Sequence, residues 1–247
     1  MKPWKTASSI GSTAALLAGA FAAVAVVLGA WAGLSEGQTP MKVGIIGAGK
    51  IGGALAEHWA KAGHEVMLSS RHPEELRPLA DRMGAKAHVG TPREAAAFGD
   101  VVLISVPYGA LPQVGRDFAA ELKGKIVLET GNPYPSRDGD MANEARRIGT
   151  GTTSPRYLPG VRLVRAFNSI PAFSLRSEAH RGGEKVAVPL AGDDPEAMRV
   201  AERLVRDAGF EPVVVGTLER AKEFDYGTSV YGRAITAREL KSALGIP

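Results

Sequence analysis

The sequence contains no cysteine, and this absence excludes three kinds of site at once. Without thiol groups the chain forms no disulfide, no thiolate metal centre and no cysteine nucleophile. The absence does not decide the compartment, because exported and cytosolic proteins can both lack cysteine. The excess of positive over negative charge is also small. The formal net charge is +4 and the basic residues are scattered among acidic ones, so no nucleic-acid partner is expected.

Recognisable catalytic motifs are missing as well. The five histidines form no H-x-x-x-H pair, and the chain contains no G-x-S-x-G elbow around a nucleophilic serine. Asp193 and Asp194 are better explained as helix caps than as a catalytic acid and base. We therefore predict no catalytic side chain and no metal site.

The first forty residues differ from the rest of the chain. Lys2 and Lys5 precede a run without charges from residue 6 to residue 35, whose apolar centre spans residues 14–34. A basic start followed by an apolar stretch is the layout of an export signal, and this stretch is also long enough to span a bilayer. Residues 1–40 are thus predicted to be a signal peptide or a membrane anchor, with membrane contact through residues 10–34.

The same segment predicts where the protein is located. If Lys2 and Lys5 stay on the cytoplasmic side, the positive-inside rule places the following domain outside the cytoplasm, either periplasmic or membrane-anchored. The alternative is that translation starts at Met41, because MKVGIIGAG is a common beginning for a free-standing α/β domain. The protein would then be cytoplasmic.

From Lys42 onward, short apolar runs alternate with stretches of helical spacing. The predicted strands cover residues 42–47, 65–69, 86–89, 101–105, 125–129, 161–166, 185–191 and 211–215. Continuous apolar strands of this length are typical of buried parallel strands, and their alternation with helices indicates a doubly wound parallel sheet. The chain after residue 40 is long enough for one such domain and too short for two large ones.

Three helical features complete the predicted fold. Residues 132–160 are rich in Pro, Gly and Ser and are predicted to hold one short helix near residues 141–148. Asp194 is predicted to cap a helix that begins at Pro195, since Asp is favoured before a helix and Pro in its first turn. Residues 234–244 are predicted to form the last helix, within a C-terminal tail of residues 226–247.

The first predicted strand runs into a glycine-rich segment with the sequence Gly47, Ala48, Gly49, Lys50, Ile51 and Gly52. Its three glycines fit G-x-G-x-x-G. The first permits a tight turn, the second lets the backbone approach a pyrophosphate, and the third lets the next helix pack on the strand. Unpaired N–H groups and the helix dipole favour anions there. The strand before and the helix after predict a Rossmann-type dinucleotide loop.

The turn after the second predicted strand indicates which dinucleotide binds. NAD sites carry Asp or Glu there to hold the ribose 2′-hydroxyl, whereas this chain reads SSRH at residues 69–72. Ser70 and Arg71 suit a 2′-phosphate, and Arg71 would make a charge-assisted contact of about 1.5–3 kcal/mol. NADP(H) is therefore the predicted cofactor. The alternative of a polar turn that tolerates either dinucleotide remains open.

Two further strand ends are predicted to complete the cofactor site. Ligands of open α/β sheets bind beyond the carboxyl ends of the strands. The residues at these two ends are Ser105, Val106, Pro107 and Tyr108 after the fourth strand, and Thr130, Gly131, Asn132 and Pro133 after the fifth. We predict that they form the floor for the ribose and nicotinamide. Simple strand termination explains the two prolines equally well.

Several segments resemble the NADPH-dependent F420 reductase family and the oxidoreductase domain of the STEAP metalloreductases. They are MKVGIIGAGKIGGALAEHWAKAGHEVMLSSR, LISVPY, LPGVRLVRAFNSIPAF and VPLAGDDPEAMRVAERLVRDAGFEPVVVG. The resemblance covers about residues 41–225. It implies that NADPH lies on the glycine loop, and that Ser70 and Arg71 bind its 2′-phosphate. It also implies that a deazaflavin or flavin ring stacks over the nicotinamide at a substrate site formed by Asn168, Ser169, Ile170 and Pro171.

The chain departs from the family pattern at two positions near the cofactor. The threonine of the family's glycine loop is Ala48 here, and a basic residue that helps to hold the phosphate is Glu75. Both changes reduce the implied selectivity for NADP. A helix that starts at Pro73 is expected to carry Glu74 and Glu75 away from the ribose.

These features predict an oxidoreductase that transfers a hydride between NADP(H) and a deazaflavin or flavin acceptor. Hydride transfer between two bound rings needs mainly proximity and orientation, whereas reduction of a carbonyl usually needs a proton donor. The missing acid favours the first. Two alternatives stay open: a non-catalytic NADP(H)-binding sensor or scaffold, and a metalloreductase partner. A homodimer is a further expectation.

The assignment of the SSRH turn can be tested by substitution. We expect Arg71→Ala to weaken NADPH binding by about tenfold or more and to leave NADH binding nearly intact, because only NADPH carries the 2′-phosphate. Titration of the protein's intrinsic fluorescence with each nucleotide measures both affinities. An equal loss for the two nucleotides would contradict the assignment.

Overall fold

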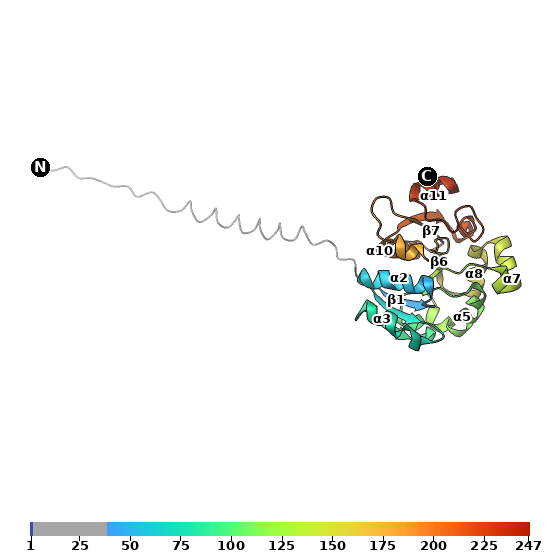
Figure 1. The fold of residues 1–247 in the computed structure, drawn as a ribbon, viewed down its shortest axis with the longest axis horizontal. Coiled ribbons are helices and arrows are strands. Elements are labelled where there is room, and N and C mark those ends of the chain that lie inside the picture. The colour runs from blue at the N-terminus through green and yellow to red at the C-terminus, as the bar shows by residue number, and fades with distance from the viewer. Residues whose placement is uncertain (2–38) are drawn as a thin grey trace. The chain divides into compact units, whose positions relative to one another are not determined.

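The computed structural model describes Met1 and residues 39–247 of the chain. Residues 40–247 form one compact unit, in which the order of the elements can be followed in Figure 1. The apolar stretch of the predicted signal peptide or membrane anchor lies outside the described residues. Among the helices that the structure describes, none is both long and apolar enough to cross a membrane.

A single sheet of eight strands runs through this unit. The strands are β1 (Lys42–Ile46), β2 (Glu65–Ser69), β3 (Ala87–Gly90), β4 (Val101–Ile104), β5 (Ile126–Glu129), β6 (Arg162–Arg165), β7 (Ala187–Gly192) and β8 (Glu211–Gly216). Their order across the sheet is β3-β2-β1-β4-β5-β6-β7-β8. All eight predicted strands are present, with ends that differ by no more than two residues. The Rossmann-type α/β fold predicted from the sequence is confirmed.

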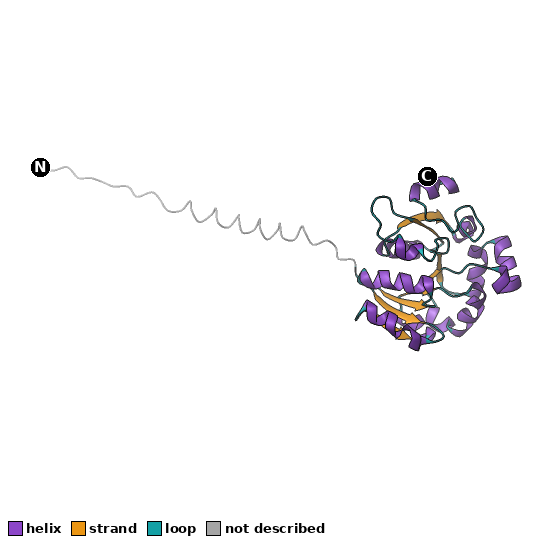
Figure 2. Ribbon diagram, in the orientation of Figure 1, coloured by secondary structure: helices purple, strands orange, loops and turns teal. Residues whose placement is uncertain are grey.

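Helices cover both faces of the sheet (Figure 2). The α-helices are α2 (Lys50–Lys61), α3 (Arg77–Met83), α4 (Pro92–Phe98), α5 (Leu111–Asp117), α6 (Ala119–Leu122), α7 (Pro135–Ile148), α8 (Thr150–Tyr157), α9 (Ser174–Ser177), α10 (Pro195–Asp207) and α11 (Ala237–Leu244). The 3-10 helices are η1 (Pro73–Leu76), η2 (Tyr108–Ala110) and η3 (Leu218–Glu223).

Alternating side chains of the strands pack against the two helical layers. Neighbouring residues of a strand point to opposite sides of the sheet. Val101 and Leu103 of β4 therefore join one apolar cluster with α2, α3 and α10. Val102 and Ile104 of the same strand join a second cluster with α4, α5, α6 and α7. This alternation is what makes the sheet doubly wound.

The sheet is not parallel throughout, which the sequence analysis did not predict. β7 pairs with β6 in the antiparallel direction, with Arg165 opposite Ala191. The segment between β6 and β7 contains only the four-residue helix α9 and no crossover helix packed on the sheet. A parallel pair needs such a crossover, so β7 returns in the opposite direction. β7 and β8 are parallel to each other, because α10 connects them.

Residues 132–160 contain more helix than predicted. The structure has α7 and α8 there, almost end to end, where one short helix near residues 141–148 was expected. Pro135 occupies the first turn of α7, where its missing N–H has no helical partner to lose. The backbone at Gly139 interrupts α7 with φ +61° and ψ −141°. The Pro, Gly and Ser content of this segment thus reflects helix starts and a kink.

The C-terminal tail packs on β7 and β8. Val230, Ile235 and Leu240 are buried in a third apolar cluster with those strands. The last helix begins at Ala237, three residues later than predicted, because Thr236 and Glu239 form a reciprocal capping box that fixes its start. As predicted, Asp194 caps α10 by accepting a hydrogen bond from the Ala197 N–H at 2.8 Å.

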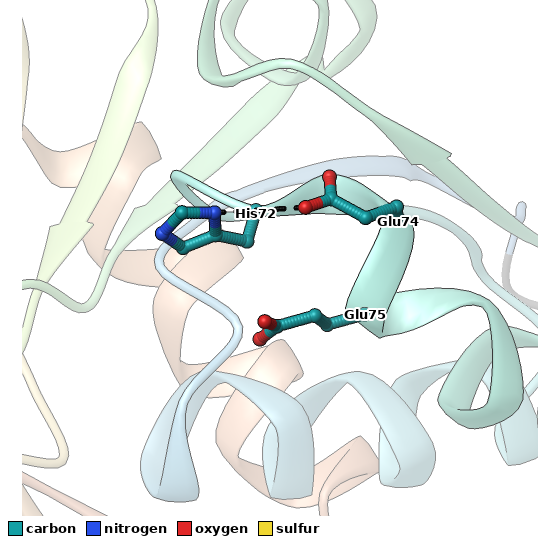
Figure 3. A group of neighbouring side chains, drawn as sticks. All are labelled: His72, Glu74 and Glu75. Carbon is teal, nitrogen blue, oxygen red and sulfur yellow. Dashed lines mark ion pairs between the residues drawn. The ribbon is translucent and has the colours of Figure 1, made fainter.

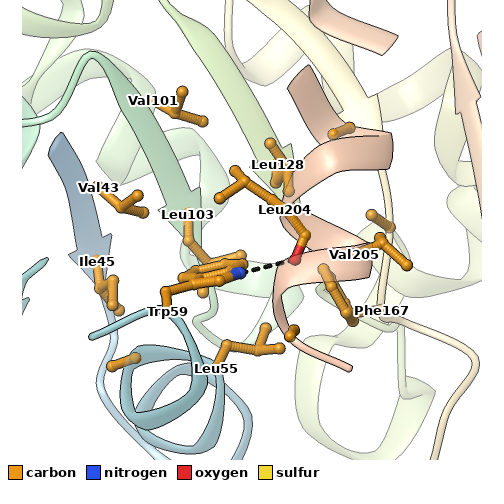
Figure 4. Packing of buried hydrophobic residues seen from close by; sticks show 14 of the residues in the cluster. Val43, Ile45, Leu55, Trp59, Val101, Leu103, Leu128, Phe167, Leu204 and Val205 are labelled. Carbon is orange, nitrogen blue, oxygen red and sulfur yellow. Dashed lines mark hydrogen bonds between the residues drawn. The ribbon is translucent and has the colours of Figure 1, made fainter. Parts of the chain in front are cut away.

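Trp59 joins the two halves of the core. Its side chain lies fully buried among Leu55, Leu103 and Phe167 (Figure 4). The indole Nε1 donates a hydrogen bond of 2.8 Å to the carbonyl oxygen of Leu204 in α10. A single side chain of α2 therefore both fills the core and fixes α10, the helix that connects β7 to β8.

Removal of this side chain tests its structural role. We expect Trp59→Ala to lower the free energy of unfolding by about 3–5 kcal/mol, because a large cavity remains in a rigid core. Urea unfolding followed by circular dichroism measures the change. Val214→Ala is the matched control, since Val214 is an apolar strand residue that is 49% exposed; its expected cost is less than about 1 kcal/mol. Equal costs for the two variants would contradict the assignment.

Candidate functional site

The glycine loop is held in a conformation that requires glycine. Gly47 has φ +97°, and a Cβ there would lie 2.4 Å from the carbonyl oxygen of Ser105. A Cβ on Gly52 would lie 2.3 Å from the carbonyl oxygen of Gly47. The N–H groups of Gly47 and Ala48 donate to the carbonyl oxygen of Ser69 at 3.1 and 2.9 Å, so the loop is tied to the end of β2.

Gly49 differs from the other two glycines of the motif. A Cβ on Gly49 would have no protein atom within 4 Å. The residue is exposed and precedes α2, so its backbone faces open space at the start of a twelve-residue helix. Such a position admits the close approach of a pyrophosphate, which the helix dipole favours.

A cavity of about 290 Å³ lies where the glycine loop meets the ends of β4 and β5. Its lining includes seven predicted cofactor contacts: Gly49, Lys50, Ile51, Ser105, Val106, Pro107 and Asn132. It also includes Thr130 and Gly131 of the predicted fifth strand end, and three residues that the sequence analysis missed: Tyr134, Arg137 and Ala172. We call this cavity the ring cavity. It lies at the carboxyl edge of the parallel strands, where open α/β sheets bind their ligands.

Two of the predicted contacts at the ends of β4 and β5 lie outside the ring cavity. Tyr108 is fully buried, and its hydroxyl forms hydrogen bonds with Thr153 at 2.5 Å and Ser154 at 3.1 Å. Burial, reinforced by the negative charge of Glu129, raises the pKa of Tyr108 to about 12. Tyr108 therefore stabilises α8 through these hydrogen bonds and does not contact the cavity. Pro133 lines a different cavity, on the far side of Tyr134.

The predicted substrate residues lie behind the ring cavity. Asn168, Ser169 and Ile170 are at most 4% exposed, and none of them lines the cavity. The side-chain amide of Asn132 donates to the carbonyl oxygen of Asn168 at 2.8 Å. Pro171 is half-buried, and the next residue, Ala172, lines the cavity. The segment thus fixes the cavity wall through its backbone, and direct contact with a substrate stays a prediction.

The turn that is predicted to bind the 2′-phosphate is exposed. Arg71 and His72 face solvent, and Ser70 Oγ accepts a hydrogen bond of 3.0 Å from the His72 N–H. Ser69 is buried and serves the sheet, since its hydroxyl donates to the carbonyl oxygen of Ile45 at 2.7 Å. The positive charge of Arg71 is therefore accessible to a ligand beside the glycine loop.

Glu74 and Glu75 do not leave this turn, which corrects the expectation from the sequence. Residues after His72 form η1, a tight 3-10 turn, and not the α-helix that would have carried them away. The side chains of His72, Glu74 and Glu75 gather at one point (Figure 3), with their ligand atoms within 4.8 Å of one another. Two carboxylates thus lie beside His72, the residue after Arg71, and their negative charge opposes the binding of a 2′-phosphate at this turn.

A buried ion network lies beneath the ring cavity. Arg165 of β6 and Glu129 of β5 are opposite each other in register, are both fully buried, and form a salt bridge. Arg165 Nη2 also donates to the carbonyl oxygen of Gly131 at 2.9 Å and lies 3.4 Å from Asp225. Burial acts to lower the pKa of Arg165, but Glu129 and Asp225 raise it above its usual value. Arg165 therefore stays charged.

Three tyrosines form a cluster at the mouth of the ring cavity. The hydroxyls of Tyr134 and Tyr231 are 2.5 Å apart, and the ring of Tyr226 lies 4.7 Å from that of Tyr134 and 5.2 Å from that of Tyr231. Burial, together with the hydrogen bond to Tyr134, raises the pKa of Tyr231. Arg137 lies over the ring of Tyr134 at 4.9 Å. No local sequence signal joins Tyr134 to tyrosines ninety residues later.

A larger cavity lies elsewhere. It measures about 970 Å³ and opens beside the start of β6 and the end of β7, next to Arg162 and Asp194. Those two side chains form a salt bridge of 2.6 Å. This cavity is at the amino edge of the parallel strands, away from the glycine loop, so we do not assign the cofactor to it.

Fold and site together define a Rossmann-type dinucleotide-binding oxidoreductase domain. Residues 42–133 match the family model described as NADP oxidoreductase, coenzyme F420-dependent. The resemblance predicted from the sequence is thereby confirmed: the chain is similar to the F420-dependent NADP reductases and to the STEAP metalloreductases, and these similarities support an NADPH-dependent oxidoreductase.

Individual relatives are distant. The chain is 29% identical to the metalloreductase STEAP3 of Rattus norvegicus over 74% of its own length, and it spans only 36% of that protein. It is 28% identical to the F420-dependent NADP reductase of Methanothermobacter thermautotrophicus, over 74% of this chain and 84% of that protein. A solved structure of a hypothetical protein from Sinorhizobium meliloti is similar with a TM-score of 0.67, at 28% identity, over 80% of this chain and 96% of the other.

The open space beside Gly49 gives a direct test of the site. We expect Gly49→Ala to weaken dinucleotide binding by about tenfold or more, because the added methyl group occupies the approach of the pyrophosphate. The free energy of unfolding should change by less than about 1 kcal/mol, since no protein atom is displaced. Gly182→Ala is the matched control, because a Cβ there also meets no atom within 4 Å. Unchanged nucleotide affinity in Gly49→Ala would exclude this placement.

Proposed function

We propose that the chain transfers a hydride between NADP(H) and a flat redox acceptor, a deazaflavin or a flavin. The observation that carries the proposal is the ring cavity itself, in which the glycine loop and two strand ends meet the aromatic side chain of Tyr134. When bound, NADPH supplies the hydride from its nicotinamide ring. The names of the relatives, F420-dependent NADP reductase, support the same pairing of cofactor and acceptor.

Different residues of this chain suit different parts of the cofactor. The open backbone at Gly49 and the start of α2 suit the pyrophosphate, and Arg71 suits the 2′-phosphate. Asn132 suits the nicotinamide end, because its Oδ1 is buried and has no hydrogen-bond partner among the described residues. An unpaired amide oxygen at a cavity wall can accept a hydrogen bond from a carboxamide group.

The chemistry of the lining favours transfer between two rings. Among the described residues that line the ring cavity there is no carboxylate and no histidine. The polar groups are hydroxyl, amide and cationic, and the Tyr134 hydroxyl is already hydrogen-bonded to Tyr231. Such a lining positions two rings and excludes water, and ring-to-ring transfer requires little more.

The role of Tyr134 separates this function from reduction of a carbonyl or imine. We expect Tyr134→Phe to lower the turnover number by less than about tenfold with a deazaflavin acceptor, because the ring stays and no proton from the hydroxyl is needed. An enzyme that used Tyr134 as a general acid would lose about 10²–10⁴-fold. Steady-state oxidation of NADPH, followed at 340 nm, measures the change; the loss of activity expected for a general acid would overturn this assignment.

The acceptor itself is identified by isotope transfer. NADPH carrying deuterium at C4 of the nicotinamide is mixed with the purified full chain and a 5-deazaflavin. We expect the deuterium to appear on carbon in the reduced acceptor, detected by mass spectrometry, because direct transfer does not exchange with water. Turnover of NADPH is measured in parallel with FMN, FAD and a ferric chelate as acceptors. Tight NADPH binding without turnover of any acceptor favours the alternative of a sensor or scaffold. Turnover of the ferric chelate only with added flavin favours the metalloreductase partner.

We further propose that the N-terminal segment exports or anchors the domain. The support is its sequence, in which Lys2 and Lys5 precede the apolar stretch of residues 14–34. NADP(H) is chiefly a cytosolic cofactor, so the compartment decides which pool the domain can use. Fractionation of cells that produce the full chain, with mass spectrometry of its N-terminus, distinguishes a membrane or exported form from a cytoplasmic form that starts at Met41.

A further inference from the structure

A second cavity lies on the other side of the tyrosine cluster. It measures about 500 Å³, and Arg146 and Arg147 of α7 and Lys222 of η3 all line it. We call it the basic cavity. Asn132 lines the ring cavity and the adjacent Pro133 lines the basic cavity. The two cavities are therefore neighbours along one short segment of the chain.

Aromatic contact also joins the two cavities. Tyr134 lines the ring cavity and Tyr226 lines the basic cavity, and their ring centroids are 4.7 Å apart. The packed rings of Tyr134 and Tyr226 thus lie between the two cavities, and a ligand that occupies both has to pass them.

The charges of the basic cavity are left without compensation. Neither Arg146 nor Arg147 has a carboxylate partner among the described residues, and Arg146 lies over the ring of Tyr226 at 5.3 Å. Lys222 is 3.9 Å from Glu219, a long and exposed pair that contributes little. Position at the end of α7 gives the arginines some stabilisation from the helix dipole. The dipole does not explain why Lys222, from another element, lines the same cavity.

The acid that lines the basic cavity does not neutralise these cations. Both oxygens of Asp225 accept hydrogen bonds from Thr150, at 2.8 Å from its N–H and 2.6 Å from its hydroxyl. The remaining charge of Asp225 faces the buried Arg165. Thr228 also lines the cavity, and its hydroxyl is buried without a hydrogen-bond partner among the residues that the structure describes. An excess of cations and an unused hydroxyl together suit a bound oxyanion.

We propose that the basic cavity binds a phosphate group on the side chain of the electron acceptor, while the acceptor ring lies in the ring cavity. This inference rests on the proposed function for the identity of the ring. Guanidinium groups match phosphate in geometry as well as charge, which favours a phosphorylated acceptor over its unphosphorylated counterpart.

The test compares FMN with riboflavin, which share one ring and differ in the phosphate. Binding to the full chain is measured by quenching of flavin fluorescence, in the presence of saturating NADP⁺ so that the glycine loop is occupied. We expect FMN to bind about tenfold or more tightly than riboflavin, and we expect added salt to reduce that preference. Because binding is measured without turnover, selective binding of FMN by a chain that oxidises NADPH with none of the acceptors overturns the proposed function and leaves this inference standing.

Substitutions decide whether the basic cavity produces the preference. In the double variant Arg147→Ala/Lys222→Ala, the affinity for FMN should fall to that for riboflavin, and the affinity for riboflavin should stay unchanged. Arg199→Ala is the matched control, since Arg199 is an exposed arginine of α10 that lines neither cavity. Unchanged affinity for NADP⁺ and an unchanged circular dichroism spectrum show that each variant is folded. Equal binding of the two flavins by the unmodified chain, a preference that survives the double substitution, or failure of both flavins to bind would each overturn the inference.

Discussion

The buried charge of Arg165 is the constraint on which the functional edge of this protein depends. An isolated guanidinium in an apolar interior is very costly, so the surrounding chain has to supply partners. Glu129 supplies one from the neighbouring strand, the carbonyl of Gly131 supplies a second, and Asp225 a third from more than fifty residues away. Asp225 is followed directly by Tyr226, so the same interaction brings the aromatic cluster to the end of β5.

The reversal of β7 has a similar effect on a larger scale. Because β7 and β8 run against the other strands, the chain leaves β8 at the amino edge of the sheet and has to cross back. It does so through η3 and residues 224–231, which bring Tyr226 and Tyr231 into contact with Tyr134 of the ring cavity. A sheet that was parallel throughout would leave β8 at the functional edge and would need no such return. The C-terminal segment therefore belongs to the site.

Opposed charges at the end of β2 bear on the choice of cofactor. Arg71 is exposed and suits a 2′-phosphate, but η1 keeps Glu74 and Glu75 beside His72 in the same turn. Exposed charges at such distances act weakly in water and are screened by salt. If Arg71 holds the 2′-phosphate as proposed, the two carboxylates reduce the preference for NADP(H) over NAD(H), as the departure at Glu75 also indicates.

The strands, the glycine motif and the helix cap at Asp194 could be predicted from the sequence, because each depends on local rules. Apolar runs mark buried strands, Gly52 is required by a backbone contact with Gly47 in the same loop, and Asp194 caps the helix that follows it. Tertiary structure alone decided the rest. Tyr108 and the segment from Asn168 to Ile170 proved to be buried supports, and distant residues such as Tyr134 and Tyr231 met at the cavity. No local sequence pattern predicts contacts between residues so far apart, since these contacts follow from the strand order and from the pairing of buried charges.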